Sequence, residues 1–428
     1  MESKEQLPAW FRKRRYLHFD RPVGVNNAEK IVCSPNNVAH HAFYPLIKYQ
    51  IISTKIRRAT NGSKLEYKEK IRDISYAAHL DAHIYSYYSN LLNSKYENFL
   101  ANSGLTKCVL AFRSLGKSNI EFAAEAFSEI SRRFECAAVA LDVSGFFDNL
   151  NHQILKKQWC DLIGCSSLPD DQYNLFRSLT RFSTVERDSV YKQFGITPSN
   201  PKYGRHRICA PKEFRTKVRD EGLISTNQEQ FGIPQGTPIS AMLSNIYMME
   251  FDAEMNAFAK SVDGLYLRYC DDILFVVPLS EIDNCGRIAG KSISALKLSI
   301  NSTKTERRAF KREKGVLLSD KPLQYLGFTF DGQQILIRSA AFARFSNRMK
   351  RGVRLAKATS RRWNKLRKER GSNEKPLYRR KLYNNYSYLG KRNFLSYGHR
   401  AAKLMNSDSI RGQLKPLWSR LLAEIEKE

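Results

Sequence analysis

Two apolar runs separated by a pair of acids form the most informative pattern in the chain. Between residues 265 and 269, leucine and tyrosine alternate with other residues, and a continuous apolar run follows from 273 to 277. Such patterns predict two strands. Because Asp is unfavourable inside strands, Asp271 and Asp272 are expected at the turn of a β-hairpin. Adjacent carboxylates repel each other, so the pair indicates a divalent cation, which hard oxygen ligands favour. A solvated turn is the alternative.

A third acid follows another apolar run. Residues 137–143 are small, branched and apolar, which predicts a buried strand with Asp142 near its end. Gly145 breaks this pattern, and apolar residues then recur at helical spacing. An acid at the end of a buried strand is well placed for catalysis, although capping of the following helix is an alternative. Asp148 lies in or beside the first helical turn, and we expect it to be structural or supporting rather than a metal ligand.

A loop followed by a helix is predicted within residues 231–252. Pro234 and Gly236 favour a tight loop, and Thr237 with the next proline is expected to cap and begin a helix. The loop would hold Gln235 where it can touch a base or a sugar. An ordinary loop-to-helix junction is the alternative.

Taken in order, these segments resemble the motifs of the reverse transcriptases. Two segments that precede these motifs, 70–92 and 111–119, resemble the fingers of the bacterial enzymes. The whole resemblance runs from about residue 10 to residue 335. The matching motifs are LDVSGFFD at 141–148, GIPQGTPIS at 232–240, YCDD at 269–272, NSTKT at 301–305 and QYLGFTF at 324–330.

The resemblance implies an α+β fold of the right-hand polymerase type that acts as an RNA-directed DNA polymerase, a nucleotidyltransferase. Residues 1–135 are expected to form an N-terminal extension and the fingers. Residues 136–335 are expected to form the palm, whose antiparallel sheet contains the YCDD hairpin. A polar insertion at about 166–230 interrupts the palm, and packs on fingers or palm or touches RNA. Residues 336–428 are expected to form a basic helical thumb.

The resemblance also assigns the reaction chemistry. Asp142, Asp271 and Asp272 would hold two Mg²⁺ ions, with Val143 also in the metal site. Two such ions activate the primer hydroxyl and neutralise the triphosphate. Lys304 matches the proposed proton donor to pyrophosphate, although a surface lysine is the alternative.

Substrate-binding roles follow in the same way. Lys70 and Arg72 match residues that hold the triphosphate of the dNTP, and a solvated strand face is the alternative. Phe147 matches the steric gate that rejects a 2′-hydroxyl, and a core aromatic is the alternative. Gln235 would contact the incoming nucleotide. The primer grip would contain Tyr325, Leu326 and Gly327.

Charge supports a nucleic-acid partner. The 428 residues have a net charge of +29 and a pI near 9.8, which favours binding to a polyanion. Residues 338–420 contain 24 Lys or Arg and only three acids, interleaved with aromatic residues. We therefore expect the thumb to lie along an RNA–DNA hybrid duplex, with strong salt dependence.

Other features narrow the class. The eight cysteines form no CxxC pair, which favours reduced thiols. His79, Asp81 and His83 resemble a metal cluster, but on a helix Asp81 would not share the face of the two histidines, so structural hydrogen bonding is favoured. No apolar stretch has the length of a membrane span and no signal core is evident, so we expect a cytoplasmic protein without a membrane partner.

The subclass is suggested by the opening segment, RRYLHFDRPVG at 14–24, which resembles bacterial reverse transcriptases of phage defence. This implies a stand-alone enzyme with a structured noncoding RNA as template. About 90 residues follow the primer grip, too few for an integrase or ribonuclease H domain. Retron enzymes usually have a VTG sequence in the thumb, which is absent here. The alternatives are an RNA-dependent RNA polymerase, which Phe147 argues against, an RNA-binding scaffold or splicing chaperone, and a template-independent or protein-primed polymerase. The pattern does not predict an oligomeric state.

Overall fold

The computed structural model describes residues 7–58 and 65–427 and divides into two compact units. The first unit comprises Met1–Phe112, Val143–Met255 and Gly290–Ile300. The second comprises Arg113–Asp142, Asn256–Ala289 and Asn301–Glu428. The helices α10 (Met249–Ser261) and α11 (Ile282–Ala295) each begin in one unit and end in the other.

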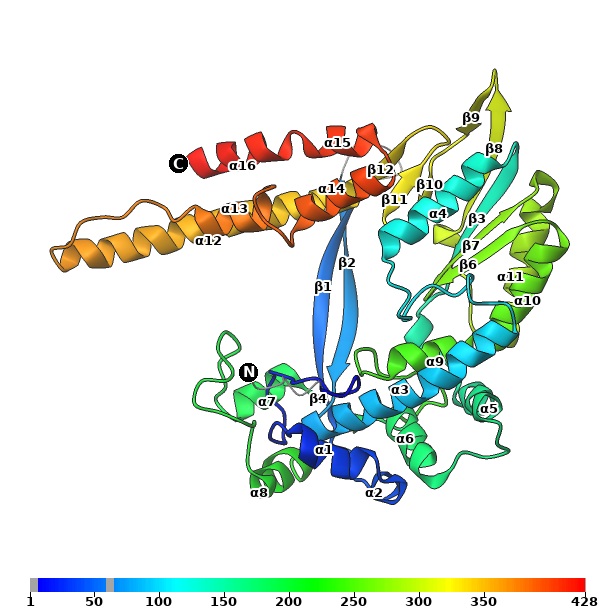
Figure 1. The fold of residues 1–428 in the computed structure, drawn as a ribbon. Coiled ribbons are helices and arrows are strands. Elements are labelled where there is room, and N and C mark those ends of the chain that lie inside the picture. Colours follow the sequence, from blue (N-terminus) through cyan, green and yellow to red (C-terminus); the bar gives the residue numbers. More distant parts are fainter. Residues whose placement is uncertain (1–6, 59–64, 428) are drawn as a thin grey trace, which may run out of the picture. The chain divides into compact units, whose positions relative to one another are not determined.

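The first unit combines a long β-hairpin with helices (Figure 1). Its elements are α1 (Val25–Val32), α2 (Pro35–Ala39), β1 (Leu46–Arg58), β2 (Leu65–Tyr76), α3 (His79–Asn102), a 3₁₀ turn (Phe146–Asp148), α5 (His152–Ile163), α6 (Asp170–Thr180), β4 (Ser183–Glu186), α7 (Arg187–Gln193), α8 (Pro211–Phe214), a π-helical turn (Arg215–Arg219), β5 (Ser225–Thr226) and α9 (Ser240–Tyr247).

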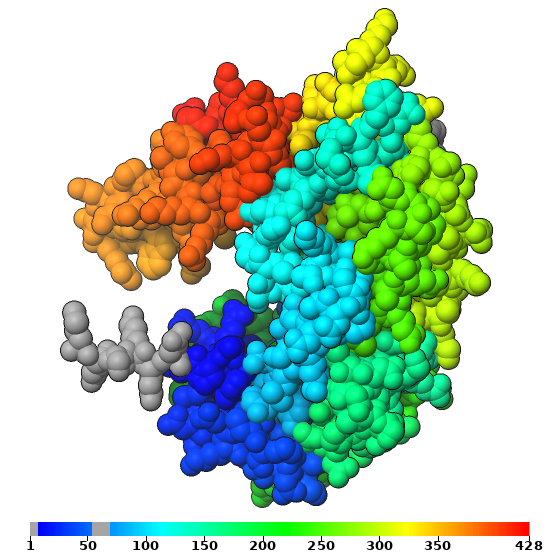
Figure 2. All heavy atoms as spheres, turned by 45° about the vertical axis from the view of Figure 1, so that its right-hand side comes forward, coloured from blue at the N-terminus to red at the C-terminus, as the bar shows by residue number. Residues whose placement is uncertain are grey.

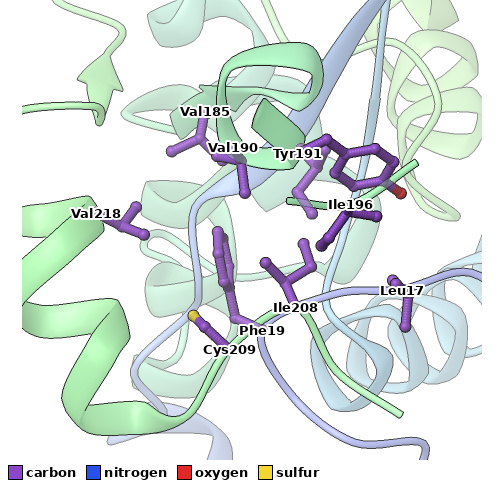
Figure 3. Packing of buried hydrophobic residues seen from close by; sticks show 10 residues of the cluster. Leu17, Phe19, Val185, Val190, Tyr191, Ile196, Ile208, Cys209 and Val218 are labelled. Atoms are coloured by element: carbon purple, nitrogen blue, oxygen red, sulfur yellow. The ribbon is translucent and has the colours of Figure 1, made fainter. Parts of the chain in front are cut away.

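The predicted insertion extends the sheet of this hairpin. The strand order is β2-β1-β4-β5, with β4 parallel to β1 from the pair Leu46 and Thr184 onward. A buried apolar cluster joins the insertion to the N-terminal segment: Phe19 packs with Val185, Ile208 and Val218 (Figure 3). The insertion therefore folds with the β1–β2 hairpin and the N-terminal segment, because its apolar residues complete a core that these segments begin.

The helix α3 contains the three residues that resembled a metal cluster, and each has a partner within the fold. The His79 ring binds the Asp20 carboxylate at 2.7 Å between Nδ1 and Oδ1. Asp81 binds His41 at 2.7 Å and accepts the backbone N–H of Tyr44 at 2.9 Å. The His83 ring is 3.4 Å from an Arg14 nitrogen and stacks on the Phe11 ring. These contacts confirm the structural interpretation. The helix α3 also contacts α5, and Figure 2 shows its segment beside the blue-green segment that contains α5.

The second unit contains two antiparallel sheets and the C-terminal helices. Its elements are α4 (Asn119–Arg132), β3 (Cys136–Asp142), β6 (Leu265–Tyr269), β7 (Asp272–Val277), 3₁₀ turns at Leu279–Glu281 and Ser302–Lys304, β8 (Glu306–Glu313), β9 (Val316–Ser319), β10 (Leu323–Tyr325), β11 (Phe328–Phe330), β12 (Ile335–Ile337), α12 (Ser339–Glu369), α13 (Arg380–Tyr386), α14 (Phe394–Leu404), α15 (Asp408–Leu414) and α16 (Leu417–Glu426).

The larger sheet places the predicted buried strand at its centre. Its order is β6-β7-β3-β8-β9, and β3 is antiparallel to both β7 and β8. Residues Cys136 to Val139 of β3 are fully buried, as expected for a strand covered on both faces. The smaller sheet has the order β10-β11-β12. Antiparallel sheets combined with helices confirm the predicted α+β class.

The C-terminal helices expose many cations. In α12, buried Phe345, Met349 and Val353 mark the inner face, and basic residues occupy most exposed positions of the helix. A core of residues from α12, α13 and α16 holds this part together, including Leu382 and Leu421. Within the part of the chain that the structure describes, no helix is both long and apolar enough to cross a bilayer.

Candidate active site

The β6–β7 hairpin and β3 bring the three predicted acids to one end of the larger sheet. Tyr269 pairs with Asp272 across a two-residue turn formed by Cys270 and Asp271. On the other side of β7, Asp272 pairs directly with Asp142 at the end of β3. Directly opposed residues of antiparallel strands have Cβ atoms about 4.5–5.5 Å apart. The register therefore brings together acids that are 130 positions apart in the chain.

The hairpin turn is strained, and a buried arginine side chain supports it. Cys270 adopts a φ of 60°, a region that costs a residue with a Cβ about 1–2 kcal/mol. Two-residue hairpin turns demand positive φ values, which explains the strain. Arg268 is fully buried and its guanidinium donates to the Cys270 carbonyl oxygen at 3.2 Å. Sequence reasoning missed Arg268, although a lone basic residue inside an apolar strand beside two acids was a signal.

Lys304 lies at this site and binds Asp142. Its ammonium donates to the Asp142 carboxylate at 2.6 Å between Nζ and Oδ1, and it also contacts Oδ2. A 3₁₀ turn, Ser302–Lys304, positions the lysine, and the Asn301 backbone N–H donates to the Asp142 carbonyl oxygen at 2.8 Å. The loop that contains Lys304 is thus anchored to the Asp142 backbone, and the Lys304 side chain binds the Asp142 carboxylate.

The electrostatics of the cluster are dominated by burial and by mutual repulsion. The pKa of Asp272 is raised to about 6, first by burial and then by the negative charges of Asp271 and Asp142. The positive charges of Lys304 and Arg338 oppose this shift. Arg338 was not predicted as a site residue, because it lies at the start of α12, 66 positions after Asp272.

The donor set suits a hard divalent cation. Among the described residues, no three His, Cys, Asp or Glu side chains are already arranged as metal ligands, and the Lys304 ammonium stands in for a cation at Asp142. The negative charges of Asp142 and Asp271 raise the pKa of Asp272, so the cluster favours added positive charge, and oxygen is the ligand that Mg²⁺ prefers. Val143, the remaining residue of the predicted metal set, is buried and forms a β-bridge with Ile300.

The predicted primer grip forms the tight turn between β10 and β11. Leu326 and Gly327 have φ values of 45° and 94°, and Tyr325 pairs with Phe328 across them. The turn is held at two carbonyl oxygens: Asn119 donates to Leu326 at 2.9 Å, and the backbone N–H of Arg338 donates to Gly327 at 3.1 Å.

The Tyr325 side chain is buried, unlike the two turn residues Leu326 and Gly327. It is only 3 % exposed, and its hydroxyl has no hydrogen-bond partner among the described residues. Burial raises the pKa of this hydroxyl, and the charge of Asp272 raises it further. The Tyr325 ring therefore lies under the site, whereas Leu326 and Gly327 form its accessible edge.

The predicted nucleotide-binding residues lie together in the first unit. Lys70 and Arg72 are on β2, opposite Ser53 and Ile51 of β1. Opposed residues share a face, and alternate positions along a strand do too, so both cations project from the same face of the hairpin.

The loop at 232–236 links Phe147 to this hairpin. The Ile233 backbone N–H donates to the Phe147 carbonyl oxygen at 2.9 Å. The Gln235 carbonyl oxygen accepts a hydrogen bond of 2.8 Å from the backbone N–H of Ser75, a residue of β2. Gly236 has a φ of 116°, and a Cβ there would lie 2.6 Å from the Ser75 carbonyl oxygen. The glycine is needed because the loop passes so close to β2.

The helix after this loop begins later than predicted. We expected Thr237 to cap it, but α9 begins at Ser240. The Thr237 hydroxyl shares a hydrogen bond of 2.6 Å with the Ser240 hydroxyl, which donates in turn to the Pro234 carbonyl oxygen. These hydrogen bonds connect residues within the loop, so the Thr237 hydroxyl does not cap the helix. The N-cap prediction was wrong for that reason.

Comparison with known proteins identifies the family. The family described as "Reverse transcriptase (RNA-dependent DNA polymerase)" matches residues 91–330, more than half of the chain. The chain therefore belongs to this family. Comparison with curated proteins gave no match of significance.

Solved structures that align with this chain include telomerases from two Candida species. Apo telomerase from Candida tropicalis aligns with 90 % of this chain and 61 % of its own, at 11 % identity and a TM-score of 0.44. Telomerase from Candida albicans with a fragment of telomeric RNA aligns with 89 % of this chain and 59 % of its own, at 12 % identity and a TM-score of 0.39. The chain therefore spans about three fifths of the length of these telomerases.

Proposed function

We propose that the protein synthesises DNA on an RNA template, with Asp142, Asp271 and Asp272 as its catalytic acids. The observation that supports this best is the register of β3 and β7, which sets Asp142 opposite Asp272 next to the turn that contains Asp271. Membership in the reverse transcriptase family supports the choice of template and product.

The acids would hold Mg²⁺, which when bound activates the primer hydroxyl and neutralises charge on the transferred phosphoryl group. Asp142 and Asp272 provide facing carboxylates from two strands, and Asp271 provides the third from the turn. Lys304 is within reach of Asp142, so its ammonium can give a proton to the pyrophosphate that leaves from that place.

Nucleotide selection would depend on the first unit. Lys70 and Arg72 share the hairpin face on which the triphosphate would bind, since fixed cations offset its charge. The Phe147 ring would exclude a 2′-hydroxyl, and the hydrogen bond between the Phe147 carbonyl oxygen and the Ile233 backbone N–H, which ties its backbone to the loop that contains Gln235, supports this role. The Gln235 side chain would contact the base or sugar, because its backbone is anchored to Ser75.

The primer and template would be held by the second unit. Leu326 and Gly327 would support the primer end, and Tyr325 would support them from below. Exposed cations along α12 would follow the phosphates of an RNA–DNA hybrid. Counterion release then makes binding weaken steeply as salt rises.

We also propose that the template is a structured noncoding RNA, and that the enzyme acts in the cytoplasm of a bacterium during defence against phage. The support is the resemblance of residues 14–24 to defence-associated relatives. Side chains of this segment contact α3 and the residues just before it. Tyr16 donates to the Ala77 carbonyl oxygen at 2.8 Å, and Asp20 binds the His79 ring. The segment is therefore integral to the first unit.

The test is purification of the protein from its native host, followed by sequencing of the RNA and DNA that purify with it. One dominant structured RNA with a complementary DNA supports the proposal. A heterogeneous RNA mixture without matching DNA contradicts it and favours an RNA-binding scaffold. DNA that matches no RNA favours template-independent or protein-primed synthesis.

A further inference from the structure

A cavity in the first unit is lined by residues that are not assigned to the reaction. It has a volume of about 810 Å³ and lies between the 41–46 segment, α3 and α6. Figure 1 shows where α3 and α6 lie in the fold. Cavities of about 300–1,000 Å³ are the usual size for small-molecule sites. The volume is therefore enough for a nucleotide.

The lining is basic. Arg177 and Arg181 line the cavity, and the described lining residues include no Asp or Glu. Both arginines are exposed, and no acidic partner for either is found among the described residues. Like charges at this i,i+4 spacing destabilise a helix by a few tenths of a kcal/mol. The negative end of the α6 dipole compensates partly, and an anion bound between the two guanidinium groups would compensate fully.

Aromatic rings line the same cavity. The rings of Phe43 and Tyr85 are stacked with centroids 5.3 Å apart, and the Tyr85 hydroxyl lies 3.0 Å from that of Ser178. Tyr173 lines the cavity too, and its ring is 45 % exposed. Lys156 lies over this ring, 5.2 Å from its centroid. The Tyr173 ring also stacks with Phe176, with centroids 6.5 Å apart, so a base would contact the part of the ring that Lys156 and Phe176 leave exposed. Bases stack on such aromatic rings, next to cations, in sites for single-stranded nucleic acids.

We propose that this cavity binds a phosphorylated nucleotide, with Arg177 and Arg181 on the phosphate and the base against Tyr173. The nucleotide is either free or one residue of an RNA strand, since both present the same chemistry. A single arginine guanidinium can bind phosphate through two N–H groups at once. None of the three acids lines this cavity, so its occupancy should not depend on polymerase activity.

The test uses the full chain in EDTA, which suppresses metal-dependent binding at the acids. The probes are 8-azido-ATP and a 12-nucleotide single-stranded RNA with 4-thiouridine, each photocrosslinked and mapped by mass spectrometry. Unlabelled ATP, the unlabelled RNA and adenosine serve as competitors. We expect crosslinks on the peptides that contain Tyr85 or Tyr173, with competition by ATP or RNA but not by adenosine.

The decisive variant is Arg177→Gln with Arg181→Gln, which should reduce this labelling at least about tenfold. Its matched control is Lys212→Gln with Arg215→Gln, an exposed pair in the same unit that removes the same charge and does not line the cavity. The control should label like the wild type. Because an arginine variant can lose stability, Tyr173→Ala at an exposed ring provides a second test and should weaken labelling several-fold.

Two results support the inference and distinguish the ligand sources. Labelling by 8-azido-ATP that the arginine variant loses indicates a free nucleotide. Labelling by RNA alone, lost in the same variant, indicates an RNA strand. Absence of label on both peptides, equal labelling in the arginine variant, or competition by adenosine equal to that by ATP overturns it. These outcomes leave the polymerase proposal unaffected, because primer extension is measured separately.

Discussion

The Lys304 ammonium donates to the Asp142 carboxylate at 2.6 Å between Nζ and Oδ1. Lys304 therefore neutralises the acid of β3, while Asp272 opposite it keeps a raised pKa. A lysine held in this way would serve two purposes. It would offset repulsion among the three acids before a metal binds, and, in the proposed reaction, it would donate a proton.

Replacing Lys304 should affect both purposes. We expect Lys304→Met to lower kcat for nucleotide addition by about 10²-fold, the lower end of what a general acid contributes. The variant should also melt at a lower temperature in EDTA, and added Mg²⁺ should raise its melting temperature more than that of the wild type. Primer extension and thermal melting measure the two effects. Unchanged kcat together with an unchanged response to Mg²⁺ would show that Lys304 is only a surface residue.

The hairpin and the buried strand could be predicted from the sequence because their signals are local. The alternation before Asp271, the apolar run after Asp272 and the small residues before Asp142 each lie within a few positions. The five-stranded sheet confirms these strands.

The supporting residues could not be predicted, because they depend on contacts between distant segments. Arg338 approaches Asp272 through the folding of β10, β11 and β12, and nothing near it in the sequence indicates this. Tyr325 belongs to a recognised motif, but only the packing shows that its ring is buried. The start of α9 was misplaced because the Thr237 hydroxyl bonds Ser240 rather than a helix N–H.

The raised pKa of Asp272 predicts how stability changes with pH. A folded-state pKa of about 6, above the unfolded value near 3.8, means that the ionised carboxylate destabilises the fold at neutral pH. This loss of stability is complete above pH 6, and it disappears as the pH falls through 6 towards 4. In metal-free buffer, Asp272→Asn should therefore stabilise the protein by about 1–2 kcal/mol at pH 7.5, after allowance for solvent screening.

Denaturant unfolding of the wild type and of Asp272→Asn at pH 7.5 and pH 4.5 measures the difference in their free energies of unfolding. The stability that the substitution adds should be smaller at pH 4.5 than at pH 7.5. A gain that is equal at both values, or a loss of stability at pH 7.5, would be inconsistent with the repulsion among Asp142, Asp271 and Asp272.

Phe147 should control the choice of sugar. Phe147→Ala opens space for a 2′-hydroxyl, so we expect the ratio of kcat/KM for dNTP over NTP to fall at least about tenfold. Single-nucleotide extension with each substrate measures the ratio. If the variant is destabilised and yet discriminates as well as the wild type, the ring is a core residue and not a gate.

Gly236 should be required for nucleotide binding. Gly236→Ala places a Cβ 2.6 Å from the Ser75 carbonyl oxygen at a φ of 116°, which costs on the order of 1–3 kcal/mol. The loop then moves from β2, and the KM for dNTP should rise. Gly290→Ala is the matched control, because no atom lies within 4 Å of its added Cβ and α11 favours alanine. Equal KM values for both variants would contradict the assignment of the loop.

The rate of single-nucleotide addition to a DNA primer on an RNA template tests the central claim most directly. Purified wild-type protein should add the complementary dNTP in Mg²⁺, and Asp142→Asn and Asp271→Asn should each reduce the rate by at least about 10³-fold, because each removes a ligand from the metal-assisted step. Asp148→Asn, at an exposed acid six residues after Asp142, is the matched control and should retain most of the rate. If the Asp142 or Asp271 variant adds the nucleotide as fast as the wild type, the three acids do not catalyse DNA synthesis.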